Sequence, residues 1–168
     1  MKKLLFLAAL VIFAGGTMFS QNYMVVDTEA VFKSIPAYNK AVDDIDAMAK
    51  EYQKNIDDAY AQIEQMYNTY MSQKASLSQS AQKSREDTII SNEKKVAEYQ
   101  ESVFGTEGII AKQQTEKLEP IQKRVKETIT NYASKNGFGL VLDISANPSV
   151  IYYSPAVNKT DAIIALFK

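Results

Sequence analysis

The pattern of apolar and polar residues predicts a long helix from about Ala37 to about Leu77. Along it, apolar residues recur at alternating steps of four and three, with charged and amide side chains between them. Such positions are the a and d positions of a heptad repeat, and a sustained repeat favours a left-handed supercoil with a partner helix. The residues of this first seam are Ile45, Ala49, Tyr52, Ile56, Ala59, Ile63, Met66 and Tyr70.

A second seam of the same period follows in the same chain. Its residues are Ile89, Val96, Tyr99, Val103 and Ile110. The segment 76–87 between the two seams is polar. The sequence therefore predicts an antiparallel helical hairpin whose return helix starts near Ser80 and runs past Gly105 and Gly108. Each glycine weakens a helix interior by about 1 kcal/mol relative to alanine. The pair marks either a bend, which we favour, or a close approach of the other helix.

The two ends of the chain have a different pattern. Short β-prone runs at 24–26, 139–145 and 150–153 predict three strands, the last two joined as a hairpin through a turn at 147–149. Pro120 is expected to break the helical pattern, which residues 121–132 resume until Asn136 and Gly137 end it. A last short helix starts within 158–161. The fold class is therefore mainly α with a small β head, from which a long coiled-coil arm extends.

These elements divide the chain into a head, formed by residues 21–36 and 120–168, and an arm, formed by residues 37–119. Three short strands are too little sheet to be stable alone. Because open strand edges invite pairing with other chains, we expect the heads to associate. The residues expected at this interface are Val25, Val26, Val141, Leu142, Ile151 and Tyr152.

The first twenty residues have the pattern of a secretory signal peptide. Lys2 and Lys3 precede an apolar run from Leu4 to Ala14, and small residues follow. The run is too short to span a bilayer. We expect export across the inner membrane to the periplasm and cleavage after Ser20, with cleavage after Gly16 as the alternative.

Composition excludes several classes of chemistry. The chain has no cysteine and no histidine, which excludes cysteine-based zinc sites, imidazole metal sites, Ser-His-Asp triads and cysteine nucleophiles. There is no glycine-rich phosphate loop. With 19 basic and 20 acidic residues, the chain has no electrostatic footprint for nucleic acid. We therefore expect no cofactor and no enzymatic activity.

Two sets of aspartates could suggest a cation site or acid–base catalysis, but the residues around them favour structural roles. Asp44 lies one residue from Asp43 and two from Asp46, and residues this close on a helix do not face each other. The three carboxylates therefore predict a solvated surface rather than a cation site. Asp27 and Asp143 have no nucleophile, metal or histidine nearby, so we expect them to cap a helix and to accept hydrogen bonds at a strand end.

The candidate binding residues lie on the arm. Tyr60 and Tyr67 are one heptad apart and off the seam, and with Met48 and Met71 they could offer adaptable apolar contacts. The alternative is that they widen the seam. A mildly basic tip, which could meet an anionic membrane surface but is more simply solvated, comprises Lys74, Lys83, Arg85, Lys94 and Lys95.

The order of motifs along the chain resembles the OmpH/Skp family of periplasmic chaperones. VVDTEAVF at 25–32 precedes the hairpin, and LEPIQKRVKETI at 118–129, GFGLVLDIS at 137–145 and VIYYSP at 150–155 follow it. The resemblance implies a homotrimer whose heads share a β-body and whose arms enclose a cavity. In that cavity the family holds unfolded outer-membrane proteins without ATP.

One departure from the family limits the comparison. The well-known enterobacterial member is markedly basic, whereas this chain has a pI of about 5.6, so its lipopolysaccharide site is not carried over. Two functions follow as hypotheses. The first is an ATP-independent holdase for unfolded envelope proteins. The alternative is a structural or adaptor coiled coil of the periplasm that holds no client.

Overall fold

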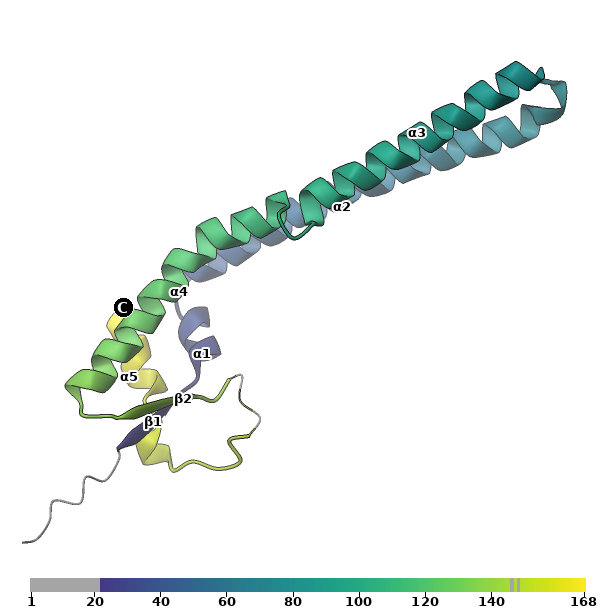
Figure 1. Ribbon diagram of the computed structural model, residues 1–168. Coiled ribbons are helices and arrows are strands. Elements are labelled where there is room, and N and C mark those ends of the chain that lie inside the picture. The colour runs from purple at the N-terminus through teal and green to yellow at the C-terminus, as the bar shows by residue number, and fades with distance from the viewer. Residues whose placement is uncertain (1–21, 146, 148) are drawn as a thin grey trace, which may run out of the picture.

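The computed structural model describes residues 22–145, 147 and 149–168, and these form a small head and a long arm (Figure 1). The expected signal peptide lies outside the described residues. The strands and helices in chain order are β1 (Tyr23–Val26), α1 (Thr28–Lys33), α2 (Pro36–Gln73), α3 (Gln79–Phe104), α4 (Ile109–Lys135), β2 (Leu140–Asp143) and α5 (Thr160–Ile164). Short 3-10 turns lie at Lys74–Ser76, Pro155–Val157 and Ala165–Phe167.

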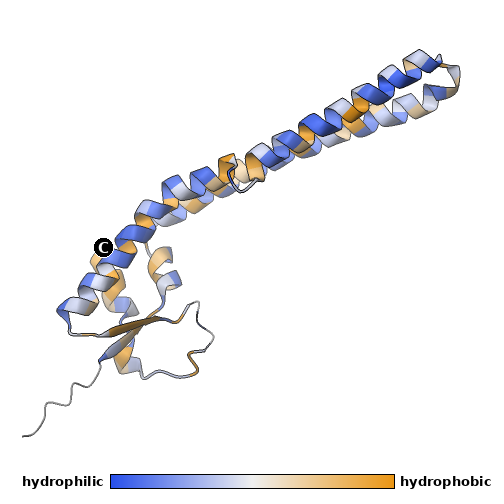
Figure 2. Ribbon diagram, viewed as in Figure 1, coloured by the Kyte–Doolittle hydropathy of each residue, from blue (hydrophilic) through white to orange (hydrophobic). Residues whose placement is uncertain are grey.

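The arm is the predicted antiparallel hairpin. Helix α2 has 38 residues, which at 1.5 Å per residue makes it about 57 Å long. Its seam residues Ile45, Ile56, Ile63 and Tyr70 are buried, whereas most residues between them are exposed. Figure 2 shows the same alternation of apolar and polar residues along both sides of the hairpin. The heptad pattern therefore predicted both the helix and the face that it buries.

The return side of the arm is interrupted, so the prediction of one helix running past the two glycines was wrong. Helix α3 ends at Phe104 and α4 begins at Ile109 (Figure 1). A Cβ on Gly108 would lie 2.5 Å from the carbonyl oxygen of Val103, and one on Gly105 would lie 2.4 Å from that of Glu101. These atoms belong to the preceding turn and not to α2. The glycines thus allow the chain to turn tightly on itself between two helices.

Pro120 does not break the helix that contains it, contrary to expectation. Helix α4 runs without interruption from Ile109 to Lys135. Proline removes one backbone hydrogen bond from a helix interior. Pro120 is exposed, so its ring displaces no packed side chain. The helix ends as predicted, with Asn136 as the C-terminal cap and Gly137 at a φ of 72°. As a result α4 packs on α2 in the arm and on α5 in the head.

The sheet of the head differs from the predicted one. Strand β2 pairs in parallel with β1, from Tyr23 opposite Leu140 to Val26 opposite Asp143. The expected hairpin between 139–145 and 150–153 was wrong, because residues 150–153 form no strand. The free side of β1 is instead occupied by the segment before α5, where Lys159 N–H donates to the carbonyl of Val25. Among the described residues the sheet has two strands.

A compact apolar core joins both ends of the chain. Its buried residues are Met24, Val26, Val31, Ile35, Val125, Ala133 and Ile163. Asp27 caps α1 by accepting a hydrogen bond from Ala30 N–H, and its own N–H donates to Thr160 Oγ1 at 2.9 Å. Asp143 accepts from the hydroxyl of Thr28 at 2.6 Å. Both carboxylates therefore have the structural roles that the sequence predicted.

The seam gives a first testable prediction. Ile56 is 1% exposed and Ile63 is 7% exposed, whereas Ile90 on α3 is 61% exposed. We expect Ile56→Ala and Ile63→Ala each to lower the free energy of unfolding by roughly 2–4 kcal/mol, because each leaves a cavity. Ile90→Ala is the matched control and should cost less than about 0.5 kcal/mol. Chemical denaturation measures all three, and equal losses would contradict the observed seam.

Candidate functional site: the flanks of the arm

The exposed apolar side chains of the arm lie beside its seam. Tyr60, Tyr67 and Met71 on α2 are 41%, 49% and 48% exposed. Met48 differs, because it is partly buried against the cluster of Ile45, Val103 and Ile110. Of the four candidate binding residues, three therefore present apolar surface to solvent and the fourth contributes to packing.

An open groove near the tip brings residues of both arm helices together. It has a volume of about 430 Å³ and is lined by Tyr67, Tyr70, Met71, Lys74, Glu86, Ile89, Ile90 and Glu93. Tyr67 and Met71 were predicted binding residues, whereas Ile90 was missed. The sequence could have shown that Ile90 is exposed, because Ile90 directly follows the seam residue Ile89. Two consecutive residues of a helix do not face the same partner helix. With Ile89 buried in the seam, Ile90 lies outside it.

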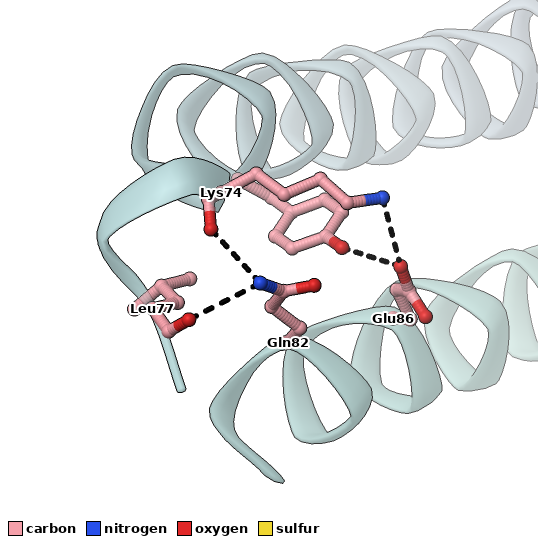
Figure 3. Close-up of polar contacts among 5 residues, drawn as sticks. Lys74, Leu77, Gln82 and Glu86 are labelled. Carbon is pink, nitrogen blue, oxygen red and sulfur yellow. Dashed lines mark hydrogen bonds and ion pairs between the residues drawn. The ribbon is translucent and has the colours of Figure 1, made fainter. Parts of the chain in front are cut away.

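Polar contacts at the tip hold the two arm helices in register (Figure 3). Gln82 Nε2 donates to the carbonyls of Lys74 and Leu77 at 3.0 and 3.1 Å. The hydroxyl of Tyr70 donates to Glu86, and Lys74 Nζ lies 3.4 Å from the same carboxylate. This hydroxyl hydrogen bond lowers the pKa of Glu86, and the same bond raises the pKa of Tyr70.

The basic residues around the tip are largely neutralised by neighbouring carboxylates. Lys74 pairs with Glu86, Lys83 with Asp87 and Lys94 with Glu98. These are exposed pairs, which contribute little to stability but cancel charge locally. Contact of the tip with an anionic membrane surface stays a prediction. The paired carboxylates leave the tip little net positive charge to attract such a surface.

The residues expected at the oligomer interface fall into three groups by exposure. Val25 and Val26 are 1% and 0% exposed and lie inside the head, while Val141 and Leu142 are half-buried. Ile151 and Tyr152 are 97% and 83% exposed. The loop that carries these two residues is therefore the most exposed apolar segment of the described head.

The described part of the chain offers no site for metal chemistry. No group of three acidic residues, cysteines or histidines within it is placed to hold an ion. Asp44 instead pairs with Lys40 at 3.1 Å and with Lys117 at 3.8 Å. In the same part of the chain, the helices lack an apolar stretch that could cross a bilayer.

The comparisons with known proteins agree with this architecture. The model of the family described as outer membrane protein (OmpH-like) matches residues 22–167. The chain belongs to the OmpH-like family. No curated protein sequence matches it.

A solved structure shows the same fold at low sequence identity. It is that of a proposed outer membrane chaperone (OmpH-like) from Caulobacter crescentus CB15, with a TM-score of 0.67 and 11% identity. The match covers 87% of this chain and 83% of the other. At this identity the likeness establishes the fold, a helical arm on a small β head, and not the chemistry of the arm.

The tip contacts of this OmpH-like chain give a second prediction. The pKa of Glu86 is lowered in the folded state, so the stabilisation is present above the ordinary glutamate value of about 4.3 and is lost as the pH falls through the folded value. The pKa of the Glu86 carboxyl should therefore lie below the ordinary glutamate value, as followed by its carboxyl chemical shift. Tyr70→Phe removes the hydroxyl that donates to Glu86, so it should raise the titration midpoint of Glu86. An unchanged Glu86 midpoint in this variant would show that the hydrogen bond is absent in solution.

Proposed function

We propose that this chain is a periplasmic holdase chaperone that binds unfolded outer-membrane proteins without ATP, in a cavity between the arms of a homotrimer. The observation that carries the proposal is the apolar flank of the arm. Tyr60, Tyr67, Met71 and Ile90 are all at least 41% exposed although the seam beside them is closed. Family membership gives this surface its interpretation as a site for unfolded chains.

Weak contacts of this kind suit a protein that must hold many sequences and release them. Each exposed apolar side chain gains at most about 1.5–3 kcal/mol on full burial, and partial burial gains less. A client held by several such contacts is kept from aggregating but stays mobile. It can leave when a better binding site competes for it, so nucleotide hydrolysis is unnecessary.

The proposed location depends on the first twenty residues. The Lys2-Lys3 pair and the apolar run after it predict removal of residues 1–20 during export. A periplasmic location also agrees with the family of the chain.

Two features of the head support association between copies of the chain. Strand β2 has one partner, β1, among the described residues, and Leu140 on it is 52% exposed. Ile151 and Tyr152 lie in the most exposed apolar loop of the described head. A two-stranded sheet is marginal in water, and pairing or packing between copies would complete it.

A charged substitution in this loop tests the trimer. Ile151→Asp places a carboxylate on a side chain that is 97% exposed in the monomer, so it should not affect folding of the chain itself. If the side chain becomes buried between copies, the unpaired charge should dissociate the assembly. Sedimentation should then show monomers, while the exposed Ser149→Asp serves as the control and stays assembled. An intact trimer in both variants would place the interface elsewhere.

The holdase activity is tested by diluting a urea-unfolded outer-membrane barrel with and without a molar excess of the mature protein, in the absence of ATP. We expect light scattering by the barrel to be suppressed at both low and high salt. The mature arm lacks a large excess of positive charge, so screening should matter little. If suppression fails at both salt concentrations, the holdase is rejected in favour of the structural coiled coil. Suppression at low salt alone would retain the holdase and contradict the argument about charge.

A further inference from the structure

The two flanks of the arm differ in chemistry near the tip. One carries Tyr60, Tyr67 and Met71 of α2 and Ile90 of α3, and we call this surface the tyrosine face. Tyr60 and Tyr67 are seven residues apart and thus on the same side of α2. Tyr67, Met71 and Ile90 line the same groove. A second groove near the tip is instead lined by Gln62, Gln65, Met66, Thr69, Arg85 and Ile89, and is dominated by uncharged polar groups and one cation.

Carboxylates border the tyrosine face. Glu93 lies in its groove, one helical turn from Ile90. Glu64 lies on α2 four residues after Tyr60 and three before Tyr67, which places it on the same side of the helix. Neither residue is in an ion pair with another described residue. The one cation in the groove, Lys74, is within 3.4 Å of Glu86, so the groove keeps a net negative charge.

The aromatic rings of this region also accept cations. Lys74 Nζ lies 5.2 Å from the centroid of the Tyr70 ring, within the range of a cation–π contact. The exposed ring of Tyr67 is one helical turn away from Tyr70 and lines the same groove. A basic side chain that enters the groove thus meets both a carboxylate and an aromatic face.

We propose that the tyrosine face binds extended segments of unfolded polypeptide in which lysine or arginine lies next to aromatic or aliphatic residues. This inference rests on the proposed function and names the chemistry that the arm selects. Apolar side chains of the client pack on Tyr67, Met71 and Ile90, and its basic side chains pair with Glu64 and Glu93. Segments with carboxylates at the same places are disfavoured because like charges would meet in the groove.

Charge also argues against two other occupants. An anionic lipid surface would be repelled by Glu64 and Glu93. A second copy of the same face would bring the same carboxylates together. Both remain outcomes that the experiment below can detect.

The experiment measures binding of fluorescent peptides to the intact mature protein by anisotropy. Three unstructured peptides of equal length are compared: aromatic and basic, aromatic and acidic, and basic without aromatic residues. The aromatic and basic peptide should bind about three- to tenfold more tightly than the aromatic and acidic one, because each exposed charge pair contributes up to about 1 kcal/mol. The peptide without aromatic residues should bind most weakly. Raising the salt concentration should reduce the difference between the first two peptides.

Two variants locate the site. The double variant Glu64→Gln with Glu93→Gln should lose the preference for the basic peptide. The control is the double variant Glu119→Gln with Glu127→Gln, which changes the net charge equally at exposed positions of α4 and should keep the preference. Tyr67→Gln with Met71→Gln and Ile90→Gln should weaken the aromatic and basic peptide about tenfold or more. The matched control on the other flank is Gln62→Ala with Gln65→Ala and Thr69→Ala, which should bind as the wild type does. Helical circular dichroism confirms folding of each variant.

Several results would overturn the proposal. Equal binding of the basic and acidic aromatic peptides would contradict the proposed selectivity. Equal weakening by substitutions on both flanks would contradict the proposed location of the site. Tighter binding to anionic vesicles than to any peptide would identify a lipid surface, and a concentration-dependent rise in mass that Tyr67→Gln abolishes would identify arm-to-arm contact. Suppression of barrel aggregation is measured in parallel. A wild type that suppresses aggregation but shows no peptide preference leaves the holdase intact and rejects the tyrosine face, whereas a wild type that fails to suppress rejects the proposed function itself.

Discussion

The arm depends on a single line of packing between α2 and its return helices. Ile56 and Val103 are almost completely buried, yet the residues next to them along each helix are exposed. A two-helix arm has no second apolar layer. Each buried seam residue therefore stabilises the few helical turns around it without help from other core residues. The seam also fixes the rotation of each helix about its axis. Because of this, the positions of Tyr67, Met71 and Ile90 on the flank follow directly from the burial of Ile63, Tyr70 and Ile89.

The sequence was a good guide where structure is local and a poor one where it is not. The heptad spacing predicted α2 and its buried face, and Asn136 with Gly137 marked the end of α4, because a helix is determined by neighbours a few residues away. The partner of β2 was not predictable in the same way. Nothing in the sequence of residues 139–145 indicates that they pair with β1. Residues 150–153 have a high β propensity, but they form no strand in the structure. Parallel pairing depends on the core built around Val26, Val125 and Ile163, which involves both ends of the chain.

The glycines and tyrosines of the arm show which features of the candidate site residue spacing can predict and which require the structure. The sequence favoured a bend at Gly105 and Gly108 over a close helix contact. The nearby carbonyls of Glu101 and Val103 show that the glycines allow a tight turn between two helices. Tyr60 and Tyr67 could be placed off the seam from spacing alone. That Met71 shares a groove with Ile90 and Glu93, while Met48 packs inward, required the register of the two helices. The tip contacts among Tyr70, Gln82 and Glu86 set that register.

The parallel pairing of β1 with β2 has a consequence for the order in which the molecule can form. Thr28 and Asp143 hydrogen-bond although they are 115 positions apart, and Asp27 and Thr160 are 133 apart. Synthesis proceeds from the N-terminus, so the apolar strand Met24–Val26 is made first and must wait for almost the whole chain before its partner exists. The tip of the arm closes over much shorter distances, since Tyr70 and Glu86 are 16 positions apart, and such local contacts form faster. Until β2 and the segment before α5 are available, the apolar strand β1 has no partner within the described chain, whereas the two sides of the arm tip can already pair.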